Sequence, residues 1–186
     1  MSKQIEKRIV IIGSAGVGKT TLLKGLQNKV KLKVIPELAR IVCRELGYKN
    51  IYEIEDPDKF RIETLKKQIK LEEKYKSFIS DRSTVDCWVH WMRWSWGRAK
   101  TYESEKYFKF TYNQALKYSH IIYIPRIGNI KAKNDGFRWN NEEYQNQMDR
   151  LFKECLLEWQ LMHRTCIVEK ERKKERIKEV LKFLNS

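Results

Sequence analysis

The chain has 186 residues, of which 41% are hydrophobic and 12% aromatic, enough to build one compact core. Its 39 Lys and Arg residues outnumber 24 Asp and Glu, and the formal net charge of +15 favours anionic partners such as nucleotides or nucleic acid. No apolar run approaches the ~20 residues that span a bilayer, and the polar start of the chain is unlike an export signal, so we expect a cytoplasmic protein without a membrane partner.

Short apolar runs alternate with amphipathic stretches along the whole chain. The runs that we predict as strands cover 8–12, 32–35, 77–80, 120–124 and 165–168. Helices are expected between them, over 37–46, 57–76, 84–98 and 102–117, after residues 20 and 140, and at the end of the chain. Asn140, with Glu143 three residues later, resembles a capping box and is the predicted cap of the helix that follows it. This alternation predicts a parallel sheet covered by helices on both faces, an α/β three-layer sandwich in a single domain over 1–186.

The turn after the first predicted strand carries the most specific motif of the chain. Residues 13–20 fit GxxxxGK[ST], between an apolar strand and an amphipathic helix, which is the context that phosphate binding at a helix N-terminus requires. Lys19 is expected to reach the β and γ phosphates, and the Thr20 hydroxyl to ligate Mg²⁺. The residues expected to hold the nucleotide are Gly13, Ser14, Ala15, Gly16, Val17, Gly18, Lys19, Thr20 and Thr21.

The rest of the chain narrows the class of phosphate-binding protein. A GTPase carries a guanine-reading NKxD after a strand, and neither 125–126 nor 169–170 provides it. A motor or helicase needs a longer chain. What remains is a small kinase, in which phosphoryl transfer depends on positioning and charge stabilisation. ATP is the expected nucleotide, with GTP as the alternative.

Several segments beyond the phosphate loop recur in one known group. They are 13–21, 36–40, 81–83 with Asp86, 135–138 and, more weakly, 175–177. On these residues the chain resembles the P-loop nucleoside and nucleotide kinases, especially ATP-binding domains similar to nicotinamide riboside kinase. The resemblance implies a five-stranded parallel sheet of order 2-3-1-4-5 and a lid segment at about 126–140.

The resemblance also suggests roles for charged residues at the ends of the predicted strands. Asp81 would hold Mg²⁺ together with Thr20, or accept the proton of the attacking hydroxyl; capping the next helix is the alternative. Glu37 would bind an acceptor hydroxyl or act as the base. Arg40, Arg82 and Asp86 would contact the acceptor substrate, or would form salt bridges or a helix cap without contacting it.

Cations of the lid region would stabilise the charge that develops on the transferred phosphoryl group. The candidates are Arg126, Lys131, Lys133 and Arg138, and Arg138 is preferred because it falls in a segment of the resemblance. A generic basic loop is the alternative.

Four tryptophans crowd the helix predicted over 84–98. Trp88 and Trp91 share a helical face and are expected in the core, whereas Trp94 and Trp96 are left to the surface or to a cleft.

Three functions follow, in order of preference. The first is a Mg²⁺-dependent kinase that moves the ATP γ-phosphate to a hydroxyl of a nucleoside, nucleotide or related small molecule. The second keeps the fold but takes the 5′-hydroxyl of a polynucleotide, which the net charge motivates. The third is a nucleotide-dependent switch or nucleic-acid-binding ATPase that hydrolyses ATP slowly. The sequence leaves the acceptor and the oligomeric state open.

Overall fold

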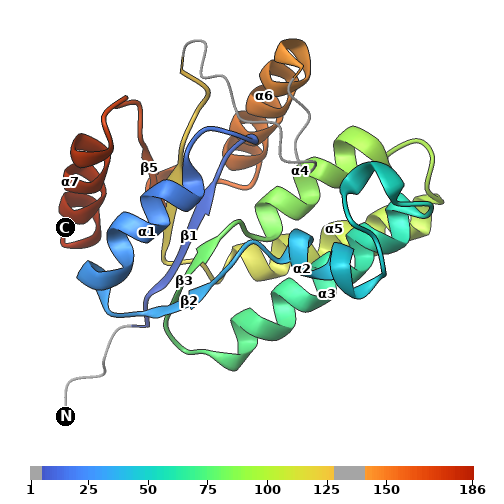
Figure 1. Cartoon of the computed structure of the whole chain (residues 1–186), viewed down its shortest axis with the longest axis horizontal. Helices are drawn as coiled ribbons and strands as arrows, with labels where there is room; N and C mark the ends of the chain where they lie inside the picture. Colours follow the sequence, from blue (N-terminus) through green and yellow to red (C-terminus); the bar gives the residue numbers. More distant parts are fainter. Residues whose placement is uncertain (1–5, 128–140) are drawn as a thin grey trace.

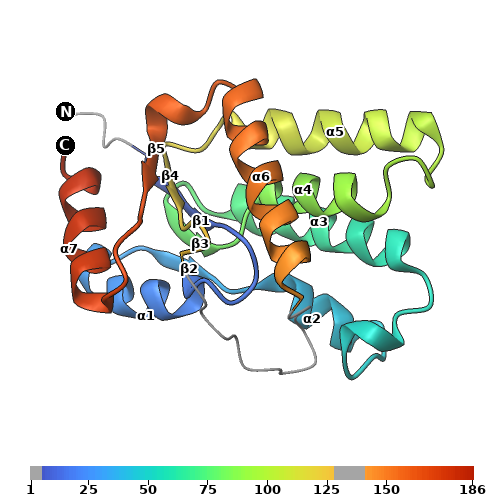
Figure 2. The same ribbon diagram turned by 90° about the horizontal axis from the view of Figure 1, so that it is seen from above.

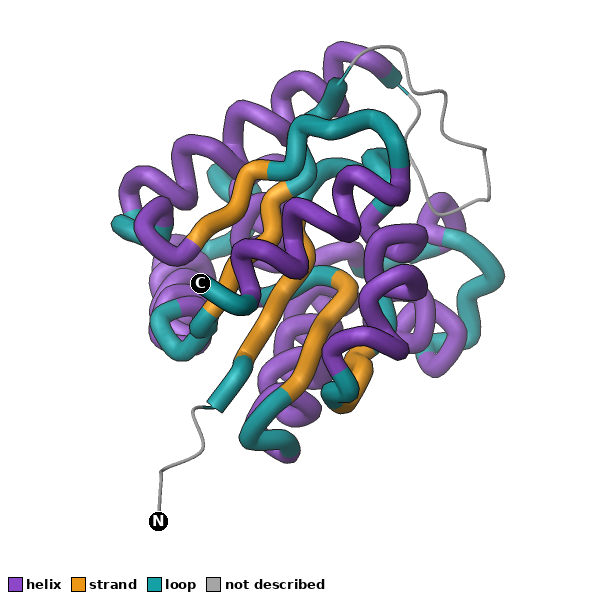
Figure 3. The backbone as a smooth tube through the Cα atoms, turned by 90° about the vertical axis from the view of Figure 1, so that its left-hand side faces the viewer, coloured by secondary structure: helices purple, strands orange, loops and turns teal. Residues whose placement is uncertain are grey.

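The computed structural model describes residues 6–127 and 141–186. Five strands form one parallel sheet in the order β2-β3-β1-β4-β5, which confirms the order that the resemblance implied (Figures 1 and 3). The strands are β1 (Arg8–Ile12), β2 (Lys33–Ile35), β3 (Phe78–Asp81), β4 (His120–Tyr123) and β5 (Thr165–Ile167).

Helices cover both faces of the sheet, so the predicted three-layer sandwich is also confirmed (Figure 2). One face carries α1 (Lys19–Val30) and α7 (Lys173–Leu184), which lie side by side. The other face carries α2 (Leu38–Glu45), α3 (Pro57–Lys74), α4 (Thr84–Trp94), α5 (Thr101–Ala115) and α6 (Glu142–Glu158).

The position of β1 between two layers of helices explains why its sequence is continuously apolar. Ile9 and Ile11 pack into the core under α1 and α7, whereas Val10 and Ile12 pack into the larger core on the opposite face. All four side chains are fully buried. A strand with helices on both sides has no solvent-facing set of positions, so polar alternation is absent.

The register of the sheet brings two distant parts of the chain together. Ile11 of β1 pairs with Asp81 of β3, so the carboxyl end of β3 lies beside the turn that leaves β1. After β1 the chain continues to β2 and β3, which lie on one side of β1, and then to β4, which lies on the other side. Ligands of open parallel sheets bind at such a reversal point, outside the carboxyl ends of the strands.

Helix boundaries agree with most of the predicted ones. Asp56 caps α3 with Pro57 at the first helical position, because its carboxylate accepts the Lys59 N–H at 2.9 Å. The predicted cap at Asn140 is wrong by one residue. Asn141 caps α6 instead, through the Tyr144 N–H at 2.9 Å. Within the described ranges, no helix is both long and apolar enough to cross a membrane.

Candidate active site

The loop between β1 and α1 depends on glycine at both of its ends. Gly13 has φ +138°, and a Cβ atom there would lie 2.4 Å from the carbonyl oxygen of Ile124. Gly18 has φ +98° and immediately precedes α1. The loop therefore delivers the chain to a helix N-terminus, whose free backbone N–H groups and positive dipole end favour phosphate.

Lys19 lies inside this loop rather than in solvent. Its ammonium group donates hydrogen bonds to the carbonyl oxygens of Gly13 at 2.8 Å and Ser14 at 2.7 Å, and the side chain is buried. Burial, together with the nearby Arg82, lowers the pKa of Lys19 to about 8. A cation held in the loop is placed to meet anionic oxygens there.

Thr20 and Asp81 meet across the gap between α1 and β3. The Thr20 hydroxyl donates to Asp81 Oδ2 at 2.5 Å, while Asp81 Oδ1 is buried and has no hydrogen-bond partner among the described residues. Among those residues no group of three or more His, Cys, Asp or Glu could hold a metal alone. Two hard oxygen atoms fit Mg²⁺, which keeps several waters and binds substrate phosphates. The geometry thus brings together the two predicted metal ligands.

Glu37, Arg40, Arg82 and Asp86 form one ionic network at the carboxyl ends of β2 and β3. Arg82 Nε donates to Glu37 at 2.7 Å, and Arg82 Nη1 donates to Asp86 at 3.2 Å. Arg40 Nε donates to the other oxygen of Glu37 at 2.7 Å. All four predicted acceptor-binding residues are therefore neighbours, although they come from two separate segments of the chain.

The backbone at Arg82 is held in an uncommon conformation. Its φ is +83°, in the left-handed region that non-glycine residues rarely adopt, and its N–H donates to the Ile11 carbonyl at 3.0 Å. This conformation accompanies a side chain that reaches back to Glu37. Strained residues of this kind persist where the surrounding structure fixes them, and they concentrate at functional sites.

Burial and charge act in opposite directions on this network. Burial alone would raise the pKa of Glu37, but the guanidinium groups of Arg82 and Arg40 outweigh it and hold the pKa well below its usual range. Burial raises the pKa of Asp86 to about 6, against the opposing effect of Arg82 and Lys19. Glu37 is therefore ionised at neutral pH and can accept a hydrogen bond from a neutral hydroxyl.

Two cavities meet at this network. A small polar one of about 120 Å³, the phosphate site, is lined by Gly16, Gly18, Lys19, Thr20, Thr21, Glu37, Asp81 and Arg82. A larger one of about 340 Å³, the acceptor pocket, is lined by residues of α2, α3, α4, α5 and α6. Glu37 and Arg82 line both. A group bound in the larger cavity is therefore next to the phosphate loop.

Apolar and aromatic side chains make up most of the acceptor pocket. They are Leu38, Ile51, Ile54, Phe60, Trp94, Tyr107 and Tyr144. Its polar lining includes Arg61, Gln68, Asp86 and His90, and burial lowers the pKa of His90 well below its usual value. Sequence reasoning missed Arg61, Gln68, His90 and Tyr144. The sequence held one signal for these residues. Gln68 follows the inward-facing Leu65 by three residues, so a polar side chain occupies the inward face of the third helix.

Asp58 joins the start of α3 to the end of α4 at the rim of the acceptor pocket. Its carboxylate accepts hydrogen bonds from Ser95 at 2.5 Å, Arg98 at 2.9 Å and Arg61 at 3.2 Å. Arg61 and Arg98 both line the pocket. The two arginines at this rim therefore share one carboxylate of the protein.

The tryptophan predictions are confirmed in detail. Trp88 and Trp91 are buried core residues. Trp94 lines the acceptor pocket, and its ring lies 5.7 Å from that of Tyr144. Trp96 is 61% exposed. One of the two tryptophans left open by the sequence therefore faces a cleft and the other faces solvent.

Most of the predicted lid cations lie outside the residues that the structure describes. Lys131, Lys133 and Arg138 lie in 128–140, beyond the described residues. Arg126 is described, and its guanidinium donates to Glu142 and Asn146 of α6. Its backbone N–H donates to Asp149 at 3.0 Å. Arg126 thus joins the end of β4 to α6 through contacts that do not involve the phosphate loop.

Arg176 supports the phosphate loop from behind. Its guanidinium donates to the Val17 carbonyl at 2.7 Å and to the Lys170 carbonyl, and the residue is buried. This arginine belongs to α7, on the opposite face of the sheet from the acceptor pocket. The structure therefore places it as a support for the loop backbone.

The sheet order and the phosphate loop together define a kinase-like P-loop protein. A family model described as an AAA domain matches residues 8–176, and the chain belongs to that family. No curated protein sequence matches the chain.

Solved structures share the fold at low sequence identity. The NadR protein in complex with NR is 19% identical with a TM-score of 0.76; the match covers 97% of this chain and 52% of that one. This chain thus spans about half the length of NadR.

Two kinases match over nearly their full lengths. Deoxyadenosine kinase from M. mycoides, with products dCMP and a flexible dCDP bound, is 20% identical with a TM-score of 0.65, and the match covers 95% of this chain and 98% of that one. Shikimate kinase from Aquifex aeolicus is 19% identical with a TM-score of 0.60, and 96% of each chain is covered. The expected resemblance to P-loop kinases is confirmed for the fold.

Proposed function

We propose that this protein is a Mg²⁺-dependent phosphotransferase that moves the γ-phosphoryl group of ATP to a hydroxyl of a nucleoside, nucleotide or related small molecule. The observation that carries the proposal is the sharing of Glu37 and Arg82 by the phosphate site and the acceptor pocket. Two substrates bound side by side in these cavities would present their reacting atoms to the same residues. Holding both reactants in place makes the reaction effectively unimolecular.

The proposed step forms a bond between the acceptor oxygen and the γ-phosphorus and breaks the bond to the β–γ bridging oxygen, which leaves with ADP. The ionised Glu37 carboxylate accepts a hydrogen bond from the acceptor hydroxyl and orients it, and the hydroxyl proton passes to an oxygen of the transferred phosphoryl group. Lys19 and Arg82 stabilise charge on the phosphoryl oxygens. Thr20 and Asp81 would hold Mg²⁺, which supplies further neutralisation of the phosphates.

The shape of the acceptor pocket supports a small acceptor over a polymer. Its volume of about 340 Å³ lies within the usual range for small-ligand sites, and its lining combines aromatic rings with a few polar groups. Its rim arginines are already paired with the carboxylates of Asp58 and Glu37. A flat, uncharged ring bearing a hydroxylated substituent fits this chemistry.

The test is an acceptor screen with ATP and Mg²⁺ over nucleosides, nucleotides, shikimate-like alcohols and 5′-hydroxyl oligonucleotides. We expect ADP release that depends on a small acceptor. Lys19→Met should abolish it. The matched control is Lys24→Met, an exposed position on the same helix, which should retain it.

Two results would contradict the proposal. ADP release that no acceptor changes would indicate an ATPase or switch. Turnover restricted to oligonucleotides, with affinity falling steeply as salt rises, would indicate a polynucleotide kinase.

A further inference from the structure

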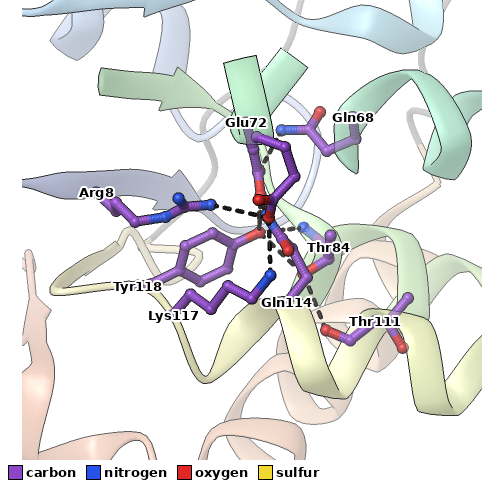
Figure 4. A network of polar contacts seen from close by, with 9 residues as sticks. Arg8, Gln68, Glu72, Thr84, Thr111, Gln114, Lys117 and Tyr118 are labelled. Carbon is purple, nitrogen blue, oxygen red and sulfur yellow. Dashed lines mark hydrogen bonds and ion pairs between the residues drawn. The ribbon is translucent and has the colours of Figure 1, made fainter. Parts of the chain in front are cut away.

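A buried carboxylate that takes no part in the proposed chemistry lies at the centre of a polar network (Figure 4). Glu72 of α3 is fully buried. It accepts hydrogen bonds from the amide nitrogen of Gln68 at 2.7 Å, the amide nitrogen of Gln114 at 2.8 Å and the Tyr118 hydroxyl at 2.9 and 3.0 Å. All three partners are donors, so the network is complete when Glu72 is ionised and only accepts.

The Gln68 amide has one orientation in this network. Its nitrogen donates one hydrogen to Glu72 and the other to the Ser80 hydroxyl at 3.1 Å, which uses both of its N–H groups. When Glu72 is ionised, turning the amide over would place its oxygen against the carboxylate, two acceptors in contact. Figure 4 shows the nitrogen of Gln68 turned towards Glu72 and the oxygen turned away.

The oxygen of Gln68 is the part of this amide that remains for a ligand. It accepts no hydrogen bond from any described residue, and Gln68 lines the acceptor pocket. Asp86 lines the same pocket, and it too accepts, from Arg82 and Ser83. Because both oxygens of Asp86 already accept hydrogen bonds, the Gln68 oxygen is the acceptor that this part of the wall offers, and its complement is a donor on the substrate.

We propose that Gln68 is a specificity-determining residue and Glu72 its positioning residue, so that the acceptor pocket selects substrates carrying an N–H donor, such as an amino-substituted base or a carboxamide. The inference rests on the proposed function, because it concerns the choice of acceptor at the same site. A substrate without that donor leaves the buried oxygen of Gln68 without a partner, which costs recognition.

Glu72 also supports the frame of the site, and the test has to separate the two effects. The Tyr118 hydroxyl that donates to Glu72 accepts the Thr84 N–H at 2.9 Å, at the start of α4. A change at Glu72 can thus lower overall activity through the fold. A ratio of activities on two matched acceptors cancels such a loss.

The experiment measures kcat/KM at about pH 8.5, where Glu72 is ionised, for pairs of acceptors that differ by one amino group. The pairs are adenosine with purine riboside, cytidine with pyrimidin-2-one riboside, and a carboxamide-bearing pyridinium riboside with its acetyl analogue. In the unmodified protein we expect the amino member of the best-used pair to be favoured at least about tenfold. Gln68→Met keeps the volume and should bring the ratio to about 1.

Glu72→Gln is the decisive variant. A glutamine at position 72 can offer either its oxygen or its NH₂ group to Gln68, so the orientation of the Gln68 amide is no longer fixed and the ratio should fall below about threefold. The matched control is Glu73→Gln, the same change at the next residue. Glu73 is bound to Lys117 and Arg8 at the surface, and its replacement should leave the ratio unchanged.

The outcomes separate this inference from the proposed function. Turnover without a preference for the amino members, or with the reverse preference, overturns the inference and leaves the kinase standing. An unchanged ratio in Glu72→Gln overturns the role of Glu72. Loss of acceptor-dependent turnover across the whole screen overturns the proposed function. In that case binding of the same pairs, measured by calorimetry, decides the inference: no amino preference in binding, or no binding, overturns it.

Discussion

The phosphate site and the acceptor pocket are adjacent, yet they are built in different ways. The phosphate site is small and polar, and most of it comes from one continuous segment, 13–21, joined by Asp81. The acceptor pocket is nearly three times larger and mostly apolar, and its walls come from five helices. Phosphate is the same in every nucleotide, so a fixed local motif can bind it. The acceptor differs between enzymes, and scattered side chains can change with it.

The comparison implies that nucleotide binding can be lost without loss of acceptor binding. Lys19→Met removes the buried cation of the phosphate loop, and we expect turnover to fall by about 10³-fold or more. Because Lys19 does not line the acceptor pocket, acceptor affinity measured by calorimetry should stay within about twofold. A parallel loss of acceptor binding would show that the two sites are not independent.

Replacing Arg82 should disturb both sites, because this residue lines both cavities. Arg82→Met leaves Glu37 and Asp86 buried without their shared partner, and we expect a loss of about 3–5 kcal/mol in the free energy of unfolding. Urea unfolding measures it. Arg44→Met, at an exposed position of α2, is the control and should stay within about 0.5 kcal/mol. A small effect at Arg82 would mean that the network is not a structural link.

Glu72, which holds Gln68 in the wall of the acceptor pocket, should give the protein a pH dependence on the acidic side of neutral, whereas Lys19 of the phosphate site has a pKa of about 8. Burial raises the pKa of Glu72 to about 7, against the hydrogen bonds from Gln68, Gln114 and Tyr118. The folded protein therefore holds this proton more tightly than the unfolded chain, and stability falls as pH rises from about 4.5 to about 7. Glu72→Gln cannot titrate.

The measurement is the difference in the free energy of unfolding between the unmodified protein and Glu72→Gln. Between pH 4 and pH 8 this difference should shift by about 3 kcal/mol against the unmodified protein. Glu73, whose pKa is lowered chiefly by its hydrogen bond from Lys117, should give the opposite sign in Glu73→Gln. A flat difference for Glu72→Gln would mean that the buried carboxyl does not change its charge over this range.

Replacing Arg176, which contacts the phosphate loop, should have the smallest effect of these variants. Arg176→Met leaves the Val17 carbonyl without its partner, so we expect a loss of about 1–3 kcal/mol in stability. The KM for ATP should rise several-fold, whereas the KM for the acceptor should not change. Lys178→Met, an exposed position on the same helix, serves as the control. Equal changes in both KM values would argue against a role confined to the nucleotide.

The sequence predicts the phosphate site better than it predicts the acceptor pocket. The motif at 13–20 needed only local spacing, and its strand and helix appear as expected. The neighbourhood of Asp81 needed the pairing of Ile11 with Asp81, which came from the resemblance and not from any local pattern. The cap of α6 was misplaced because two consecutive asparagines offered two starts, and Asn141 provides the one used.

The acceptor pocket was beyond sequence reasoning for a physical reason. Gln68, His90 and Tyr144 lie on three helices, and only tertiary packing brings them to one cavity. Their own spacing along the chain carries no signal. The polar pair Gln68 and Glu72 on a helix face with Leu65 was the one visible irregularity, since such positions are usually apolar. A buried carboxylate in a helical stripe is therefore worth testing as part of a site.

The contact between Arg176 and Val17 has a consequence for how the protein is made. The two residues are 159 positions apart, so a chain emerging from the ribosome exposes its entire phosphate motif long before the last helix can brace it. Until Arg176 arrives, the loop keeps its glycines and its lysine but lacks its support on the far side (Figure 2). A growing chain should therefore reach its full nucleotide affinity only after α7 has been made and has packed beside α1.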